Sequence, residues 1–417
     1  MINRDKYLNE LIKRMNNGLI KVITGLRRCG KSYLLNEIFY KYLISINVKK
    51  DHIIMISLED LENRKYKDPY LLNEHVKSLI RDDGMYYIMI DEIQEVNDFV
   101  PLLNTWIKNK QMDVYVTGSN SRFLSKDIIT EFRGRGDIVH LFPLSFKEFY
   151  EYRQGNFDEI LDEFLHFGGM PFILKREDKL MKINYLKDLY REIYLKDIKE
   201  RYKIRNDSEL VELLCILASS VGSLTNPTKL EHTFKSVKKV SASRNTINTY
   251  LEILEDSYLV KKSLRYDIKG KKYINSLNKI YFTDLGLRNA LLNFREFEIP
   301  HLMENLIFNE LSIRGYALDI GVVESYIKNE KNNNIRTQIE IDFIASRGDT
   351  KYYIQSFSNV FEEAKLIQEI RPFTKVNDSF KKILIVRENI SPRIDENGII
   401  MISLKDFLLD ENILEKC

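Results

Sequence analysis

Short apolar runs alternate with amphipathic stretches along the first part of the chain, a pattern typical of strands joined by helices. One run, YYIMI, is apolar throughout, as expected for a strand buried on both faces of a parallel sheet. Strands are expected at residues 19–24, 52–58, 86–90 and 113–117, and amphipathic helices at residues 1–17 and 69–80. Residues 1–165 are therefore expected to form an α/β domain with a parallel sheet.

The first expected strand leads into the sequence GLRRCGKS, and a helix follows it. This sequence has the G-x-x-x-x-G-K-S spacing of a phosphate-binding loop, in the strand, loop and helix order that such a loop requires. Its glycines let successive backbone N–H groups point at phosphates, at the positive end of the helix dipole. Lys31 would reach the β- and γ-phosphates, and Ser32 would hold Mg²⁺. The expected nucleotide-binding residues of the loop are Gly25, Leu26, Arg27, Arg28, Cys29, Gly30, Lys31, Ser32 and Tyr33.

Two carboxylates, Asp91 and Glu92, directly follow the run YYIMI. Ligands bind at the carboxyl ends of the strands in parallel sheets, so both acids are expected beside the phosphate-binding loop. Asp91 would hold Mg²⁺ through water, and Glu92 would polarise an attacking water molecule. The alternative is a helix cap or a solvated loop, but the upstream loop favours the catalytic role. The base-reading motif N-K-x-D is absent, which favours ATP over GTP.

Four further polar residues are candidates for the same site. Ser119 and Asn120 follow the strand expected at residues 113–117, where they would sense the γ-phosphate or orient water; a simple Gly/Ser turn is the alternative. Arg133 and Arg135 would stabilise transition-state charge, in cis or from a neighbouring subunit. An ordinary surface salt bridge is the alternative for these arginines.

Five segments together carry a resemblance to a known family: GLRRCGKS, MIDEIQ, TGSNSRFL, RGRGDIVHLFPLSFKEF and HFGGMPF. The chain resembles a large prokaryotic family of AAA-type, STAND-like P-loop ATPases, whose members carry a C-terminal domain of unknown function similar to restriction endonucleases. The resemblance makes Arg135 the family's arginine and places Pro171, in a G-x-P turn, against the nucleotide; a tight inter-helix turn is the alternative. It implies ATP binding and hydrolysis by Lys31, Ser32, Asp91 and Glu92.

Residues 166–265 are expected to form a helical and winged-helix domain. From residue 208 onward the pattern indicates a helix, a short helix, a turn, a helix and a two-stranded wing. The third helix would present polar side chains outward, as a helix that enters a DNA major groove does. Acidic residues at the end of this helix oppose phosphate contact, so DNA binding and internal packing both stay open. The outward residues are Arg244, Asn245 and Asn248, and nearby basic residues are Lys235, Lys238 and Lys239.

Residues 266–417 show an order of elements that resembles a restriction-endonuclease-like core, with a helix expected at residues 300–314. A nuclease site of that type needs an acid on the helix, an acid on the second strand, and an acid and a lysine on the third. Glu304 and Asp342 match the first two positions. The strands are expected at residues 322–327, 338–345, 351–357, 382–386 and 399–402, with a helix at residues 360–369.

The third strand departs from this nuclease pattern, because Gln355 replaces the acid and Phe357 replaces the lysine. Glutamine offers Mg²⁺ only a neutral oxygen, so metal binding should be weak. We therefore expect a nuclease-like domain that does not cleave nucleic acid. A lysine supplied by another element, with Lys351 as the candidate, would restore activity.

Composition narrows the function only slightly. Lys and Arg total 64 against 61 Asp and Glu, a net charge of +3, so any nucleic-acid contact must come from a local patch. The three cysteines are scattered, and no apolar run has the length of a signal-peptide core or a membrane span. A cytoplasmic protein without disulfides or a zinc site is expected.

The function expected from these features is Mg²⁺-dependent binding and hydrolysis of ATP, with the nucleotide state controlling the winged helix and the nuclease-like domain. Two alternatives stay open. One is an ATP-gated nuclease of a defence or toxin system, and the other is a binding module that holds ATP as a structural ligand. The choice between DNA, RNA and protein as partner, and the question of self-association, also stay open.

Overall fold

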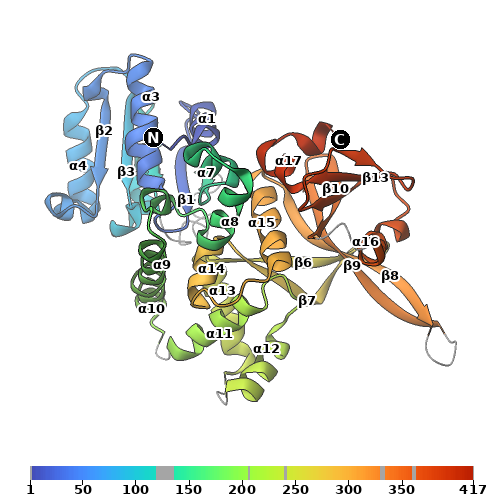
Figure 1. Cartoon of the computed structure of the whole chain (residues 1–417). Coiled ribbons are helices and arrows are strands. Elements are labelled where there is room, and N and C mark those ends of the chain that lie inside the picture. The colour runs from blue at the N-terminus through green and yellow to red at the C-terminus, as the bar shows by residue number, and fades with distance from the viewer. Residues whose placement is uncertain are drawn as a thin grey trace. The chain divides into compact units, whose positions relative to one another are not determined.

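The computed structural model describes residues 2–118, 136–204, 207–238, 242–328, 334–358 and 363–416. The chain folds into two compact units (Figure 1). The first unit consists of residues 1–143 with residues 256–258, and the second of residues 144–255 and 259–417. The three-domain division at residues 165 and 265 stays a prediction. In the described ranges, none of the helices combines the length and apolar character that crossing a membrane would require.

The first unit contains a parallel five-stranded sheet with the order β2-β3-β4-β1-β5. Its strands are β1 (Ile20–Gly25), β2 (Ile53–Ser57), β3 (Tyr86–Asp91), β4 (Met112–Thr117) and β5 (Gly136–Leu141). The α/β fold predicted from the apolar runs is confirmed. Strand β5 was not predicted, because its sequence GDIVHL mixes polar and apolar residues. It pairs with β1 along its whole length and so supports the strand that leads into the phosphate-binding loop.

Helices cover both faces of this sheet. On one face, α4 and α5 pack Leu72 and Trp106 into the apolar core. On the other face, the Phe39 ring lies 4.6 Å from the Tyr115 ring of β4. The helices are α1 (Asp5–Lys13), α2 (Lys31–Tyr33), η1 (Leu34–Phe39), α3 (Tyr40–Ser45), α4 (Pro69–Leu79) and α5 (Phe99–Trp106), with short turns η2 (Lys50–His52), η3 (Leu61–Lys67) and η4 (Ile93–Glu95). Segments α2, η1 and α3 run without a break, so one helix follows the phosphate-binding loop.

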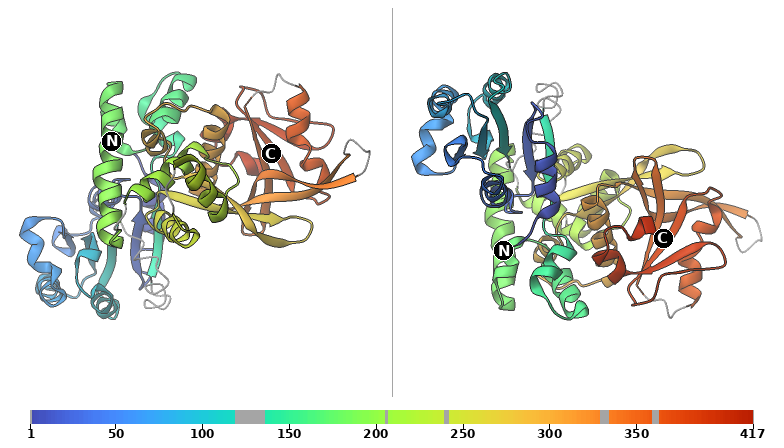
Figure 2. Two further views of the ribbon diagram at one scale, coloured as in Figure 1. Left: turned by 90° about the horizontal axis from the view of Figure 1, so that it is seen from below. Right: turned by 90° about the horizontal axis from the view of Figure 1, so that it is seen from above.

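The second unit begins with helices, and α9, η7 and α10 follow one another as one long helical rod (Figure 2). The first helices are α7 (Phe146–Arg153), α8 (Phe157–Phe167), η6 (Pro171–Lys175), α9 (Lys179–Asp188), η7 (Leu189–Leu195) and α10 (Lys196–Tyr202). Next come α11 (Asp207–Ser219), α12 (Pro227–Thr233), η8 (Phe234–Lys238) and α13 (Arg244–Asp256). The remaining helices are α14 (Leu285–Leu291), α15 (Ile299–Ile313), α16 (Glu363–Ile370), η9 (Phe373–Lys375), α17 (Leu404–Leu409) and α18 (Ile413–Lys416).

A mixed eight-stranded sheet organises the rest of the second unit, with the order β12-β13-β11-β10-β9-β8-β6-β7. Its strands are β6 (Val260–Asp267), β7 (Lys272–Phe282), β8 (Ala317–Lys328), β9 (Asn334–Arg347), β10 (Thr350–Phe357), β11 (Lys381–Val386), β12 (Arg393–Ile394) and β13 (Ile399–Ser403). The hairpin β6–β7 extends to Phe282, beyond the boundary expected at residue 265, and its assignment as a wing stays a prediction. Three residues of β6, 265–267, pair in parallel with residues 320–322 of β8, so this hairpin and the C-terminal strands share one sheet.

Candidate nucleotide-binding site

The phosphate-binding loop connects the end of β1 to the helix that begins at Lys31. At Gly25 the backbone angle φ is +143°, and a Cβ atom there would lie 2.1 Å from the carbonyl oxygen of Leu141 in β5. Only glycine fits that approach. Gly30 caps the helix with φ of +106°, which also favours glycine. Both glycines of the motif are therefore required by the backbone itself.

Lys31 is held inside the loop, with 4% of its surface exposed. Its Nζ donates hydrogen bonds to the carbonyl oxygens of Gly25 and Leu26, at 3.2 Å each. These neutral acceptors keep the ammonium at the loop that would surround the phosphates. A phosphate oxygen would offer it a charged acceptor, which makes a stronger hydrogen bond.

Ser32 and Asp91 lie together, although 59 residues separate them in the sequence. The Ser32 hydroxyl donates to Asp91 Oδ1 at 3.0 Å. The Thr117 hydroxyl at the end of β4 donates to the same Oδ1, and its oxygen accepts the Glu92 N–H at 2.9 Å. Strand β4 lies between β1 and β3, so Thr117 links the two predicted motifs. Thr117 was not predicted; the available signal was its place at the carboxyl end of an apolar strand.

Burial raises the pKa of the Asp91 carboxyl, while hydrogen bonds from Thr117 and Ser32 and the charge of Lys31 oppose that rise. A cation beside this carboxylate would favour its ionised form further. The Ser32 hydroxyl and the Asp91 carboxylate are hard oxygen ligands of the kind Mg²⁺ prefers. No cluster of three or more His, Cys, Asp or Glu side chains in the described ranges has the geometry to hold a metal. These two residues therefore fit Mg²⁺ that takes its other ligands from phosphate and water.

Glu92 is buried and has left-handed backbone angles, with φ of +56° and ψ of +51°. Such a conformation is unusual for a residue other than glycine, and strained residues of this kind cluster at functional sites. The amide of Gln94 donates to its carboxylate. The Glu59 carboxylate pairs with Arg27 at 3.5 Å, and burial followed by the charge of Glu92 raises its pKa. Glu59 is a further acid at this edge of the sheet that sequence reasoning missed.

The other predicted loop residues differ in exposure. Arg28 and Tyr33 are exposed, whereas Leu26 and Cys29 are buried. The Cys29 thiol donates to the Leu141 carbonyl at 3.4 Å, and burial raises its pKa. Four predicted residues, Ser119, Asn120, Arg133 and Arg135, lie outside the described residues.

Pro171 follows a tight turn in the second unit, so its contact with a nucleotide stays a prediction. The turn is bonded on both sides. The N–H of Gly169 donates to Asp284 Oδ2 at 2.8 Å, and its carbonyl accepts the N–H of Leu144 at 2.8 Å. A Cβ atom on Gly168 would lie 2.4 Å from Asp284 Oδ1. The turn is thus held to the segment that follows β7.

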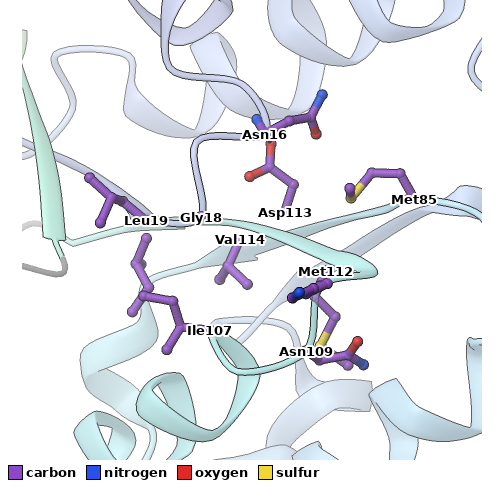
Figure 3. Close-up of a pocket in the computed structure, with 11 residues that line it drawn as sticks. Asn16, Gly18, Leu19, Met85, Ile107, Asn109, Met112, Asp113 and Val114 are labelled. Carbon is purple, nitrogen blue, oxygen red and sulfur yellow. Dashed lines mark hydrogen bonds between the residues drawn. The ribbon is translucent and has the colours of Figure 1, made fainter.

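A small cavity of about 200 Å³ lies at the opposite, amino edge of the first sheet (Figure 3). Asp113 faces it, accepts the Asn16 N–H at 3.0 Å and forms a buried ion pair with Lys21. The residues that line the cavity surround the starts of β1, β3 and β4. Because this edge is remote from the phosphate-binding loop along each strand, we assign the cavity no part in nucleotide binding.

The residues of the predicted nuclease-like site also come together, within the second unit. Gln355 Oε1 accepts the N–H of Asp342 at 3.1 Å. Lys279 Nζ lies 2.7 Å from Glu304 Oε1 and 3.1 Å from Asp342 Oδ1. The predicted replacement lysine was wrong, because Lys351 Nζ lies over the Phe380 ring at 4.7 Å from its centre. Lys279 on β7 supplies the charge instead, and no sequence signal distinguished it from the other lysines.

Comparison with known proteins agrees with the architecture of the first unit. A family model described as "AAA domain" matches residues 17–150, and one described as "Domain of unknown function (DUF8612)" matches residues 158–298. An uncharacterized protein of Haemophilus influenzae is 32% identical over 418 residues, covering 98% of this chain and 99% of the relative. An uncharacterized protein of Methanocaldococcus jannaschii is 31% identical over 400 residues, covering 91% and 82%.

Similarity to solved structures is weak. The structure of the Aeropyrum pernix ORC1 protein in complex with DNA is 14% identical, with a TM-score of 0.30, and the match covers 70% of this chain and 92% of that one.

Proposed function

Since the chain carries an AAA domain and belongs to one family with the uncharacterized Haemophilus influenzae and Methanocaldococcus jannaschii proteins, we propose that it binds ATP with Mg²⁺ and hydrolyses it. The observation that carries this proposal is the 3.0 Å hydrogen bond from Ser32 to Asp91. It joins the phosphate-binding loop to the acidic strand end that a phosphoryl-transfer site needs.

Each residue then has a defined task. The backbone amides of the loop bind the phosphates, and Lys31 neutralises their charge. Ser32 and Asp91 hold Mg²⁺, which when bound withdraws negative charge from the phosphate oxygens. Glu92 orients the attacking water and accepts its proton. Thr117 fixes the Asp91 carboxylate and the backbone of Glu92, since its hydroxyl bonds to both.

ATP turnover is tested with two variants that remove different tasks. Lys31→Ala should lose ATP binding, because it removes the buried ammonium that neutralises the phosphates. Glu92→Gln should bind ATP as the wild type does and lose turnover by a factor of about 100 or more, the usual contribution of a positioned base. Calorimetry measures binding and phosphate release measures turnover. Equal hydrolysis by all three proteins would contradict the assignment.

We propose further that the nucleotide state is passed to the second unit as a switch. Two hydrogen bonds would carry such a change onward within the second unit: the Gly169 N–H to Asp284, and the Leu287 N–H to the same carboxylate at 2.9 Å. Asp284 lies two residues after the end of β7 and caps α14. A displacement of the turn at residues 168–171 would therefore act on the link between β7 and α14.

DNA binding by a winged helix is the second candidate function. The order α11, α12, α13 and the hairpin β6–β7 is that of a winged helix, and Thr225 forms an antiparallel bridge to Asn278 of the wing. Arg244, Asn245 and Asn248 are exposed on α13, as predicted. An exposed helix face with a cation and two amides can contact phosphates and base edges.

A further inference from the structure

One ammonium group lies between two buried carboxylates in the second unit. Lys279 Nζ contacts Glu304 Oε1 at 2.7 Å and Asp342 Oδ1 at 3.1 Å. All three residues are buried, and the exposed fractions of their side chains are 7% for Lys279, 11% for Glu304 and 12% for Asp342. They come from β7, α15 and β9, so the packing of one helix on two strands brings them together. These carboxylates are the two that the nuclease-like pattern would use for a metal ion.

The carboxylate oxygens are fixed by further donors. Tyr281 donates to the same Glu304 Oε1 at 2.6 Å. Ser356 donates to Asp342 Oδ2 from its N–H at 3.0 Å and from its hydroxyl at 3.2 Å. Glu304 Oε1 and both oxygens of Asp342 therefore already have partners, and these donors hold Glu304 Oε1 and Asp342 Oδ1 toward the ammonium.

Electrostatics keep Lys279 charged in this place. Burial alone lowers the pKa of its ammonium, but the charges of Glu304 and Asp342 outweigh burial and raise the pKa above its ordinary value. A buried pair of carboxylates needs such a cation, because two unpaired charges away from water would be very costly. A divalent ion would have to approach the same oxygens to about 2.0 to 2.6 Å. It cannot do so while the ammonium holds them.

Other protein groups also surround the two carboxylates. The Gln355 side chain makes two hydrogen bonds: its Oε1 accepts the Asp342 N–H, and its Nε2 donates to Glu369 at 2.8 Å. Gly222 covers Glu304 so closely that a Cβ atom there would lie 3.2 Å from the carboxylate. The nearby Glu340 carboxylate forms an ion pair with Arg265 at 3.2 Å. A protein donor or cation thus lies beside each of the two nearby acids, Gln355 beside Glu369 and Arg265 beside Glu340.

We propose that Lys279 is the permanent cation of this site, so that the nuclease-like domain excludes divalent ions, and that removing the ammonium turns Glu304 and Asp342 into a divalent-cation site. The domain then works without metal chemistry, as a binding or assembly module. This inference is independent of ATP binding, because every residue that carries it belongs to the second unit.

The test uses the full chain without nucleotide and counts bound Mn²⁺ by electron paramagnetic resonance. Every variant carries Asp91→Asn, so that the ATPase site contributes no ion. The parent protein should bind no Mn²⁺ that depends on Asp342. Addition of Lys279→Met should create one site at least tenfold tighter than any in the parent, and further addition of Asp342→Asn should abolish it.

Three results would overturn the proposal. The first is Mn²⁺ binding in the parent that Asp342→Asn removes. The second is a folded Lys279→Met protein that gains no ion. The third is Mn²⁺-dependent cleavage of DNA by the protein with Lys279 in place, abolished by Asp342→Ala, since it would make the ammonium part of a working nuclease.

A second variant covers the case in which Lys279→Met does not fold. Gln355→Glu keeps the ammonium and adds the carboxylate that the nuclease pattern lacks. We expect this protein to bind no additional Mn²⁺, because the lysine still holds the cation position. A new Mn²⁺ site in Gln355→Glu would show that the ammonium does not exclude metal, and the proposal would fail.

Discussion

At the scale of single residues, several acids of the second unit are buried, among them Asp284, Glu304 and Glu310. Asp284 is the clearest case, because its carboxylate accepts backbone N–H groups from both the turn at Gly169 and the start of α14. Burial raises the pKa of Asp284 to about 6, although those backbone hydrogen bonds oppose the rise. Its ionisation therefore falls in a range of pH that folding experiments can reach.

This carboxyl should make stability depend on pH. Between about pH 4 and pH 6 the folded protein keeps a proton that the unfolded chain has released, so stability falls as pH rises and levels off above about pH 6. The shift corresponds to roughly 3 kcal/mol. The change in unfolding free energy between about pH 4 and pH 6, measured by urea unfolding, should differ from that of the wild type by that amount in Asp284→Asn. The exposed Asp349→Asn should show the wild-type change, and a wild-type change in Asp284→Asn would contradict the assignment.

Sequence reasoning succeeded for residues whose role is set by local spacing. The loop glycines, Ser32 and Asp91 could be placed because a motif after a strand has one geometry. Thr117 and Lys279 were missed because their roles depend on which strands become neighbours. Thr117 matters because β4 lies between β1 and β3, and Lys279 because β7 packs beside α15. Neither relation is contained in the spacing of residues along the chain.

At the scale of elements, the pattern of apolar residues predicted most strands of both sheets to within a few residues. Strand β5 was missed because its burial is mixed, with half-buried residues at four of its six positions. Its partner β1, in contrast, is buried at every position. The sequence GDIVHL therefore offered no continuous apolar run of the kind that revealed the neighbouring strands.

Helix α13 carries the prediction that belongs to this scale. If it contacts DNA, Arg244→Ala combined with Asn248→Ala should weaken binding. Removal of the arginine should also reduce the slope of log affinity against log salt concentration by about 1, the value for one lost phosphate contact. Fluorescence titration of duplex DNA at two salt concentrations measures both effects. Lys196→Ala, an exposed cation on α10, is the matched control. Equal affinity for the double variant and the wild type would favour internal packing of the helix.

At the scale of the whole molecule, the division into two compact units predicts two separable thermal transitions. ATP with Mg²⁺ should raise the transition of the first unit, by about 2.7 kcal/mol of stability when ATP is present at 100 times its dissociation constant. Scanning calorimetry measures the shift, and Lys31→Ala should abolish it. A shift of the second transition that Pro171→Ala removes would place this proline at the nucleotide. No shift in either transition would contradict ATP binding.

The parallel pairing of β6 with β8 has a practical consequence for dissecting this protein. A fragment that starts at residue 268 lacks β6 and leaves residues 320–322 of β8 without their neighbouring strand. The unpaired amide and carbonyl groups of β8 then form an exposed edge strand, which can pair with strands of other chains. Such a fragment is expected to aggregate, so any study of the C-terminal strands in isolation needs to retain the hairpin that closes their sheet.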